Sequence, residues 1–126
     1  MKIIESLLKE MEKLKLTDIK LFNLEKKSII ADYFLLGSAD NSTQLEACRN
    51  KFIDAFWKKE IPLKNPQEEW EGGWLAMDFG NVIIHVFLNE MRSFYNLDDI
   101  LSNAETQEEM IEVLKSVRKR KKAVSN

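Results

Sequence analysis

The sequence predicts an α/β sandwich, with a mixed sheet of about five strands flanked by helices. Segments with apolar residues at helical spacing alternate along the chain with pairs of short, apolar, β-branched segments. One of these short segments is apolar on both faces, which is typical of a strand in the middle of a covered sheet. The length of 126 residues suits a single domain with a hydrophobic core.

The N-terminal half is predicted to form a helix, two strands and a second helix. Residues 2–14 have the amphipathic spacing of a helix, and strands are predicted over 18–25 and 29–37 with a turn between them. The second strand is the one that is apolar on both faces, so we expect it at the centre of the sheet. The helix that follows extends to Trp57, and three residues are candidates for its N-cap: Asn41, Ser42 and Thr43.

The C-terminal half is predicted to contain three strands followed by helices. Pro62 and Pro66 bracket a loop, and a short strand is expected around 68–70. Strands over 74–79 and 82–87 are separated by Gly-Asn, a strong signal for a two-residue hairpin turn. Two short helical turns are expected within 89–104, and a final helix from about 106 to 120.

The two faces of this hairpin differ in composition. Because side chains alternate along a strand, one face is entirely apolar and is assigned to the core: Leu75, Met77, Phe79, Val82, Ile84 and Val86. The other face combines apolar residues with one carboxylate and the only imidazole of the chain: Trp74, Ala76, Asp78, Ile83, His85 and Phe87. This mixture is typical of a protein-binding surface. The alternative is a face covered by a helix, with a single contact between His85 and Asp78.

The carboxylate of Asp78 limits how far the mixed face can be buried. Burying its carboxylate without a partner would be costly or would force it into the neutral form. We therefore expect Asp78 to be paired, with His85 or Arg92, or to lie near solvent.

Charge is distributed unevenly along the chain. The net charge is −2, yet residues 115–122 contain six basic residues and no acidic one. A basic tail on an acidic body suggests a nucleic-acid or acidic partner, whereas the alternative is a solvated helix end whose cations oppose the helix dipole.

Composition also indicates the cellular compartment of the protein. The only cysteine, Cys48, has no partner for an internal disulfide, which fits a reducing compartment. No apolar run reaches the roughly 20 residues that span a bilayer, and the charged N-terminal segment lacks the pattern of a signal peptide. We expect a cytoplasmic protein without a membrane partner.

The sequence argues against catalysis. One histidine excludes the usual zinc sites, and no G-x-S-x-G elbow marks Ser42 or Ser93 as a nucleophile. The Gly-Ser pair at 37–38 is similar to the phosphate-binding turn of nucleotidyltransferases. Those enzymes hold two metal ions with a pair of carboxylates, and the corresponding window here contains only Asp54. We therefore predict no enzyme activity, no cofactor and no metal ion.

Two blocks of sequence, "ADYFLLGSADNSTQLEA" and "WLAMDFGNVIIHVFLNEMRSFYNLDDIL", resemble the ribosomal silencing factor family, also called Iojap-like proteins. The resemblance covers about residues 5–104, so we expect a family domain over 1–104 and a C-terminal helix with a basic tail over 105–126. The matching positions are Asp32, Tyr33, Ser42, Gln44, Trp74, Asp78, Phe79, Gly80, Val82, His85, Val86, Phe87, Arg92, Tyr95, Leu97 and Asp98.

The resemblance implies a non-enzymatic factor that binds the large ribosomal subunit through ribosomal protein L-fourteen. Bound there, it would block joining of the small subunit and repress translation when nutrients are scarce. The resemblance also implies a nucleotidyltransferase-like fold without its metal site, and a homodimer when the protein is free.

On this interpretation the mixed face is the partner-binding site. The expected site residues are Trp74, Asp78, His85, Phe87, Arg92 and Tyr95. The aromatic residues would anchor the partner, and Asp78 and Arg92 would set the register through charge-assisted hydrogen bonds. The basic tail would contact ribosomal RNA. Two alternatives remain: an RNA-binding module that uses this tail, and a nucleotidyltransferase-like enzyme with a nucleotide at the loop 37–42.

Overall fold

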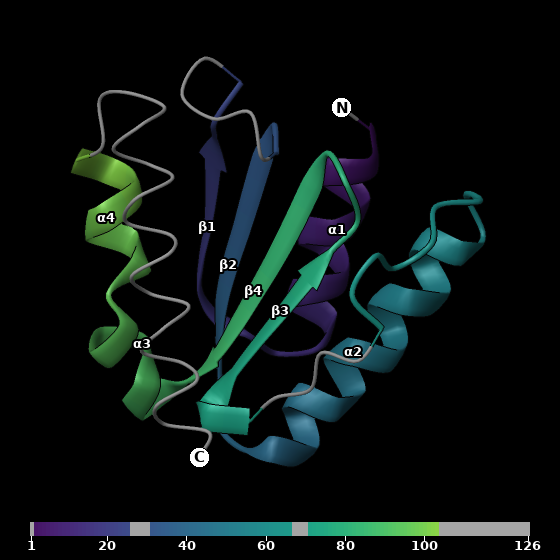
Figure 1. Ribbon diagram of the computed structural model, residues 1–126. Helices are drawn as coiled ribbons and strands as arrows, with labels where there is room; N and C mark the ends of the chain where they lie inside the picture. Colours follow the sequence, from purple (N-terminus) through teal and green to yellow (C-terminus); the bar gives the residue numbers. More distant parts are fainter. Residues whose placement is uncertain (1, 26–30, 67–70, 104–126) are drawn as a thin grey trace.

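Nine elements follow one another along the chain of this computed structural model, which describes residues 2–25, 31–66 and 71–103 (Figure 1). The strand predicted near 68–70 and the helix predicted over 106–120 lie outside these ranges. The elements are α1 (Lys2–Lys13), β1 (Thr17–Asn23), β2 (Tyr33–Ala39), α2 (Ser42–Trp57), the 3-10 turn η1 (Glu71–Gly73), β3 (Trp74–Asp78), β4 (Val82–Leu88), α3 (Asn89–Tyr95) and α4 (Leu97–Asn103).

The described strands form one mixed sheet in the order β1-β2-β4-β3. β1 is antiparallel to β2, β2 is parallel to β4, and β3 is antiparallel to β4. The predicted mixed sheet is therefore confirmed with four strands in the described residues. β2 is a central strand, as its two apolar faces predicted.

Helices cover both faces of the sheet (Figure 1). α1 and α2 pack on one face, and the apolar hairpin residues predicted for the core all lie in this layer, including Leu75, Met77 and Val86. We call this layer the α1–α2 core. α3 and α4 pack on the opposite face, where the α3–α4 core is formed by Leu24, Ala31, Phe34, Leu36, Trp74, Ala76, Ile83, Phe87, Tyr95, Leu97 and Leu101. Covering both faces explains why β2, β3 and β4 contain few polar residues, whereas the edge strand β1 is mostly exposed.

The N-terminus of α2 is held by two side chains. Asn41 is the N-cap, and its Oδ1 accepts a hydrogen bond from the Gln44 amide at 2.9 Å. In return, Gln44 Oε1 accepts from the Asp40 amide at 2.7 Å, and Gln44 Nε2 donates to the Leu14 carbonyl. The cap thus satisfies one of the free backbone donors of the first turn, and Gln44 ties the helix start to the end of α1. On the buried side of α2, burial raises the pKa of the Cys48 thiol to about 12.

The hairpin β3–β4 sets which side chains face the α3–α4 core. Its turn is Gly80-Asn81, as predicted, with the Phe79 amide donating to the Val82 carbonyl at 3.0 Å. Gly80 adopts φ +91°, a conformation that favours glycine. In the resulting register Trp74 lies opposite Phe87, and Ala76 lies opposite His85.

The two edges of the sheet differ. Along β3, Asn65 acts as a short substitute for a neighbouring strand, because its side chain donates to the Ala76 carbonyl and accepts from the Asp78 amide. Along β1, the pairing register shifts between Thr17 and Lys20, and Asp18 has φ +49°. A bulge of this kind distorts an edge and disfavours pairing with another strand.

Candidate functional site

A layer of aromatic rings covers the sheet beneath α3 and α4. Trp74 from β3 lies 5.3 Å from the Phe87 ring and 4.8 Å from the Tyr95 ring, measured between centroids. All three side chains are buried. The Tyr95 hydroxyl donates to the Gly72 carbonyl at 2.8 Å, so the polar end of this ring has a partner inside the structure. The structure thus brings together three of the six predicted site residues as one packed cluster.

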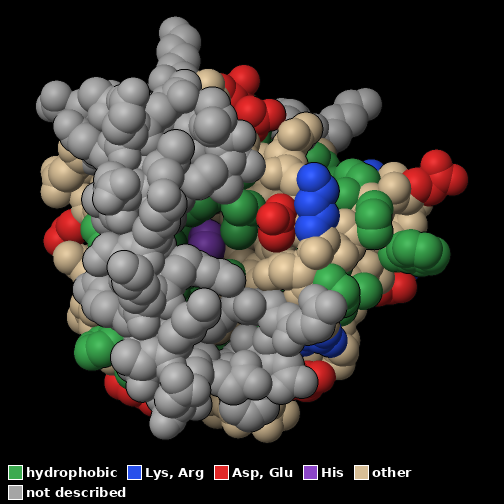
Figure 2. Space-filling view, in the orientation of Figure 1, with side chains coloured by type: hydrophobic (Ala, Val, Ile, Leu, Met, Phe, Trp, Pro, Cys, Tyr) green, Lys and Arg blue, Asp and Glu red, His purple; other side chains and the backbone are tan. Residues whose placement is uncertain are grey.

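His85 lies within the same layer as a partner of Trp74. Its side chain is 4% exposed, and its ring centroid is 4.6 Å from that of Phe34. The indole Nε1–H of Trp74 donates to His85 Nδ1 at 3.0 Å. Because an indole only donates, Nδ1 must be unprotonated, which places the proton of the neutral ring on Nε2. Figure 2 shows the small visible part of the imidazole in purple, next to hydrophobic side chains.

Asp78 does not form the contact that we expected with His85 or Arg92. It lies at the far end of β3, where its Oδ1 accepts a hydrogen bond from the Gly80 amide at 2.8 Å. The side chain is partly exposed and supports the hairpin turn. Of the alternatives expected for Asp78, the position near solvent is confirmed and the pairing is not. The local turn supplies a nearer donor to Asp78, whereas the Trp74 indole supplies the donor for His85.

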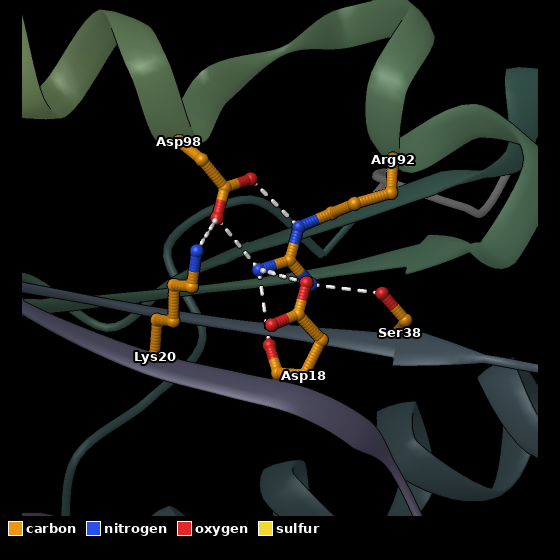
Figure 3. Close-up of polar contacts among 5 residues, drawn as sticks. All are labelled: Asp18, Lys20, Ser38, Arg92 and Asp98. Atoms are coloured by element: carbon orange, nitrogen blue, oxygen red, sulfur yellow. Dashed lines mark hydrogen bonds and ion pairs between the residues drawn. The ribbon is translucent and has the colours of Figure 1, made fainter.

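Arg92 is the centre of a network that joins four elements (Figure 3). Its side chain extends from α3 and forms two hydrogen bonds to the Asp98 carboxylate of α4, at 2.7 and 2.8 Å. It also donates to Ser38 Oγ of β2 at 2.8 Å and to the Asp18 carbonyl of β1 at 3.0 Å. The guanidinium, although only 7% exposed, is thus well supplied with acceptors.

Two carboxylates and one lysine lie around Arg92, so positive and negative charges balance within this network. Lys20 Nζ lies 3.3 Å from Asp98 Oδ2, and Asp18 Oδ2 lies 3.5 Å from Arg92 Nη2. The hydrogen bond from Arg92 is the main reason that the pKa of Asp98 is lowered, and Lys20 acts in the same direction. The guanidinium also lies 5.9 Å from the centroid of the Phe87 ring, which links this network to the aromatic layer.

A corner between α3 and α4 positions both the aromatic layer and the Arg92 network. Asn96 adopts φ +52° and ends α3, and its amide donates to the Arg92 carbonyl. Asn is among the few non-glycine residues that tolerate this conformation. The corner turns Tyr95 inward, while the neighbouring Phe94 is 49% exposed and lies with its ring edge-on to Tyr95 at 5.1 Å.

Sequence reasoning missed several members of this site. Phe94 was not distinguished from the surrounding helical residues, and the roles of Ser38, Asp18 and Lys20 were not predicted. A usable signal was the six-residue spacing of Arg92 and Asp98 across Asn96, because a helix corner at Asn96 brings the two side chains together.

The remaining candidates for chemistry lie elsewhere. Asp54, the lone carboxylate of the nucleotidyltransferase window, forms an exposed pair with Lys58 on α2. Within residues 2–25, 31–66 and 71–103, no three His, Cys, Asp or Glu side chains are grouped so that they could hold a metal ion. None of the helices in these ranges is long and apolar enough to cross a membrane.

The fold and site define a small α/β protein whose polar residues join helices to a sheet. The model of the family described as "Ribosomal silencing factor during starvation" (RsfS) matches residues 1–126. The chain belongs to this family.

Individual relatives agree with this assignment. The ribosomal silencing factor RsfS of Bacillus subtilis is 32% identical over 87 residues, which cover 69% of this chain and 74% of that protein. The chloroplastic protein Iojap of Zea mays is 29% identical over 99 residues, 79% of this chain and 43% of that longer protein. A crystal structure of a protein from Chromobacterium violaceum superposes with a TM-score of 0.71 at 19% identity, covering 84% of this chain and 88% of that one, and shows the same fold.

Proposed function

We propose that this protein is a ribosomal silencing factor that acts in the cytoplasm on the large ribosomal subunit. Through ribosomal protein L-fourteen it would bind that subunit and sterically block joining of the small subunit, repressing translation when nutrients are limiting. The observation that supports this proposal is the match of the family model to residues 1–126. The Bacillus subtilis relative bears the same functional name. Binding and steric exclusion need a shaped surface and no reacting group, so this function is regulatory.

The proposed docking face is the outer side of α3 and α4. Trp74, His85, Phe87, Arg92 and Tyr95 are buried below this face, so we propose that they shape it from beneath. Asp78, which is partly exposed, would support the adjoining hairpin turn. The contacts that join the five buried residues to the sheet and its helices support this role.

Phe94 is the proposed anchor of this face. Its exposed ring lies directly on Tyr95, which in turn contacts both Trp74 and Phe87. An exposed aromatic ring on a packed base loses little conformational freedom on binding, which favours a binding hot spot. Exposed carboxylates on the same two helices, Glu90 and Asp99, suit a basic partner.

The test is binding of the full chain to purified large subunits, and separately to purified L-fourteen. We expect Phe94→Ala to weaken both interactions by about 30-fold, as truncation of a hot spot costs roughly 2 kcal/mol. Leu21→Ala is the matched control, because Leu21 is also an exposed hydrophobic residue but lies on β1. Equal binding by wild type and Phe94→Ala would exclude this docking face, and no binding by wild type would exclude the function.

Subunit joining measures the proposed mechanism directly. Sedimentation of the two subunits with wild-type protein should show fewer joined ribosomes than sedimentation with Phe94→Ala. Binding to the large subunit without any effect on joining would contradict steric exclusion.

Two further features of the proposal rest on sequence. The basic residues 115–122 lie outside the described residues, and we propose that they contact ribosomal RNA. Removing residues 115–126 should weaken binding to the large subunit modestly and make that binding less dependent on salt.

We also propose a homodimer of the free protein, which sedimentation equilibrium would detect. A monomer at all accessible concentrations would contradict the dimer.

A further inference from the structure

Trp57 is the most exposed large hydrophobic side chain among the described residues, at 68%. It is the last residue of α2, and its neighbour Phe56 points into the α1–α2 core, where it stacks on Phe79 with centroids 3.8 Å apart. A tryptophan is usually buried against apolar surface, so an indole held in solvent on a well-packed helix invites a functional explanation.

The backbone around Trp57 is well ordered by hydrogen bonds. The amides of Lys59 and Ile61 both donate to the Phe56 carbonyl, and the Glu60 amide donates to the Trp57 carbonyl, all at 2.9 to 3.0 Å. These bonds close the end of α2 onto the loop that follows. The indole is therefore presented from a fixed backbone, which lowers the entropic cost of using it in binding.

The residues next to Trp57 are charged. Lys58 and Lys59 directly follow it in the sequence, and both are exposed. Lys58 pairs with Asp54 at 3.2 Å, but both side chains are well exposed, and an exposed pair of this kind is easily exchanged for another anion. Lys59 and Glu60 are exposed as well.

These features favour one class of partner. The two exposed aromatic rings differ in the charges beside them: carboxylates lie on the helices of Phe94, whereas Lys58 and Lys59 directly follow Trp57. A flat aromatic ring beside flexible ammonium groups is the usual means of binding unpaired nucleotides, because bases stack on the ring while cations meet the phosphates. We propose that Trp57, Lys58 and Lys59 form a contact site for single-stranded RNA. The choice of RNA over DNA rests on the proposed ribosomal function.

The site is separate from the proposed docking face. α2 covers the face of the sheet opposite to α3 and α4 (Figure 1). A single molecule would thus hold a protein on one side and an unpaired RNA segment on the other. Two weak contacts on one large particle reinforce each other, because the second forms at a high effective concentration.

The experiment measures binding of the full chain to a fluorescein-labelled 12-nucleotide single-stranded RNA of mixed sequence, at roughly 50 mM salt where phosphate contacts are strong. Trp57→Ala should weaken binding by about 5- to 150-fold, the range for loss of a stacked base. Trp57→Phe should retain most of the affinity. Phe94→Ala is the matched control, since it removes another exposed aromatic ring from the opposite side of the sheet and should have no effect.

Two further measurements test the mode of binding. A duplex of the same sequence should bind more weakly than the single strand, because its bases are not available for stacking. Replacing both Lys58 and Lys59 by glutamine should reduce the slope of log K against log salt by up to about 1.4. All variants carry the same basic tail, so its own RNA binding contributes equally to each.

The RNA-binding measurements test the proposed site without any ribosome in the assay. The proposal is overturned if Trp57→Ala binds the single strand like wild type, if Phe94→Ala loses as much affinity, or if the duplex binds equally well. Loss of large-subunit binding by Trp57→Ala with unchanged RNA binding would instead indicate a protein contact and would also overturn it. If wild-type protein binds RNA through Trp57 but does not bind large subunits, the RNA site stands and the ribosomal function fails.

Discussion

At the scale of single residues, the polar groups of the α3–α4 core are paired in ways that composition does not reveal. A histidine and an aspartate on one hairpin face suggested a contact between them, but His85 accepts from Trp74 and Asp78 accepts from Gly80. The deciding factor is position along the strands, because the hairpin places His85 beside the indole and Asp78 at the turn. Residue types alone do not report that geometry.

The tautomer of His85 follows from its hydrogen bond. Because Nδ1 accepts from the Trp74 indole, we expect nitrogen chemical shifts at neutral pH that show Nδ1 unprotonated and Nε2 protonated. A two-dimensional NMR correlation of the ring nitrogens and protons measures this directly, since the chain has a single histidine. Trp74→Phe, which removes the donor, is the control. A protonated Nδ1 in the wild-type protein would contradict the hydrogen bond.

The Asp98 carboxylate should make stability depend on pH in acid. Its pKa in the folded protein is lowered from 3.8, chiefly by the hydrogen bond from Arg92. Its contribution to the free energy of unfolding is therefore fully present above pH 3.8 and is lost as the pH falls from 3.8 through the lower folded-state value. Urea denaturation at several pH values should show the difference between wild type and Asp98→Asn shrinking in this window. A difference that stays constant would contradict the assignment.

At the scale of elements, most helices and strands followed from the periodicity of the sequence. The hairpin, its Gly-Asn turn and the cap at Asn41 are confirmed because each depends on a short local pattern with a direct physical cause. The sequence left open whether the mixed face is a binding surface or is covered by a helix, and the structure shows that α3 and α4 cover it. α3 and α4 are short and joined by Asn96, and their side of the sheet is decided by long-range packing and the Arg92 network. Periodicity in so short a segment does not identify the face it will cover.

The Arg92 network should contribute measurably to joining these elements. We expect Arg92→Lys to lower the free energy of unfolding by about 1–3 kcal/mol, because an ammonium group does not reproduce the two parallel bonds to Asp98. Urea denaturation followed by tryptophan fluorescence measures the loss. Lys20→Gln is the control, since it removes only an exposed charge near Asp98 and should cost at most about 1 kcal/mol. Equal losses in the two variants would show that the guanidinium geometry is unimportant.

At the scale of the whole molecule, two hydrophobic layers share one sheet. The α1–α2 core and the α3–α4 core have no residue in common, and they meet through the backbone of the strands. β2 and β4 are the inner strands and carry buried side chains on both faces, whereas β1 and β3 form the edges. The inner strands should therefore open only when the whole protein unfolds.

Amide hydrogen exchange tests this arrangement. We expect the amides of β2 and β4 to show the slowest exchange, with free energies of opening that equal the global free energy of unfolding. β1 should exchange faster, since its pairing is interrupted by a bulge. The measurement is native-state exchange in increasing urea, read by NMR or mass spectrometry. Protection of β1 equal to that of β4 would contradict the proposed order of stability.

The burial of Cys48 makes the wild-type chain suited to selective chemical labelling. Its thiol is enclosed in the α1–α2 core with a pKa of about 12, so the reactive thiolate is scarce at neutral pH. A new cysteine placed at an exposed position such as 57 or 94 would react with a maleimide probe while Cys48 stays unmodified. A photocrosslinker or fluorophore could therefore be placed on either side of the sheet without first replacing the native cysteine.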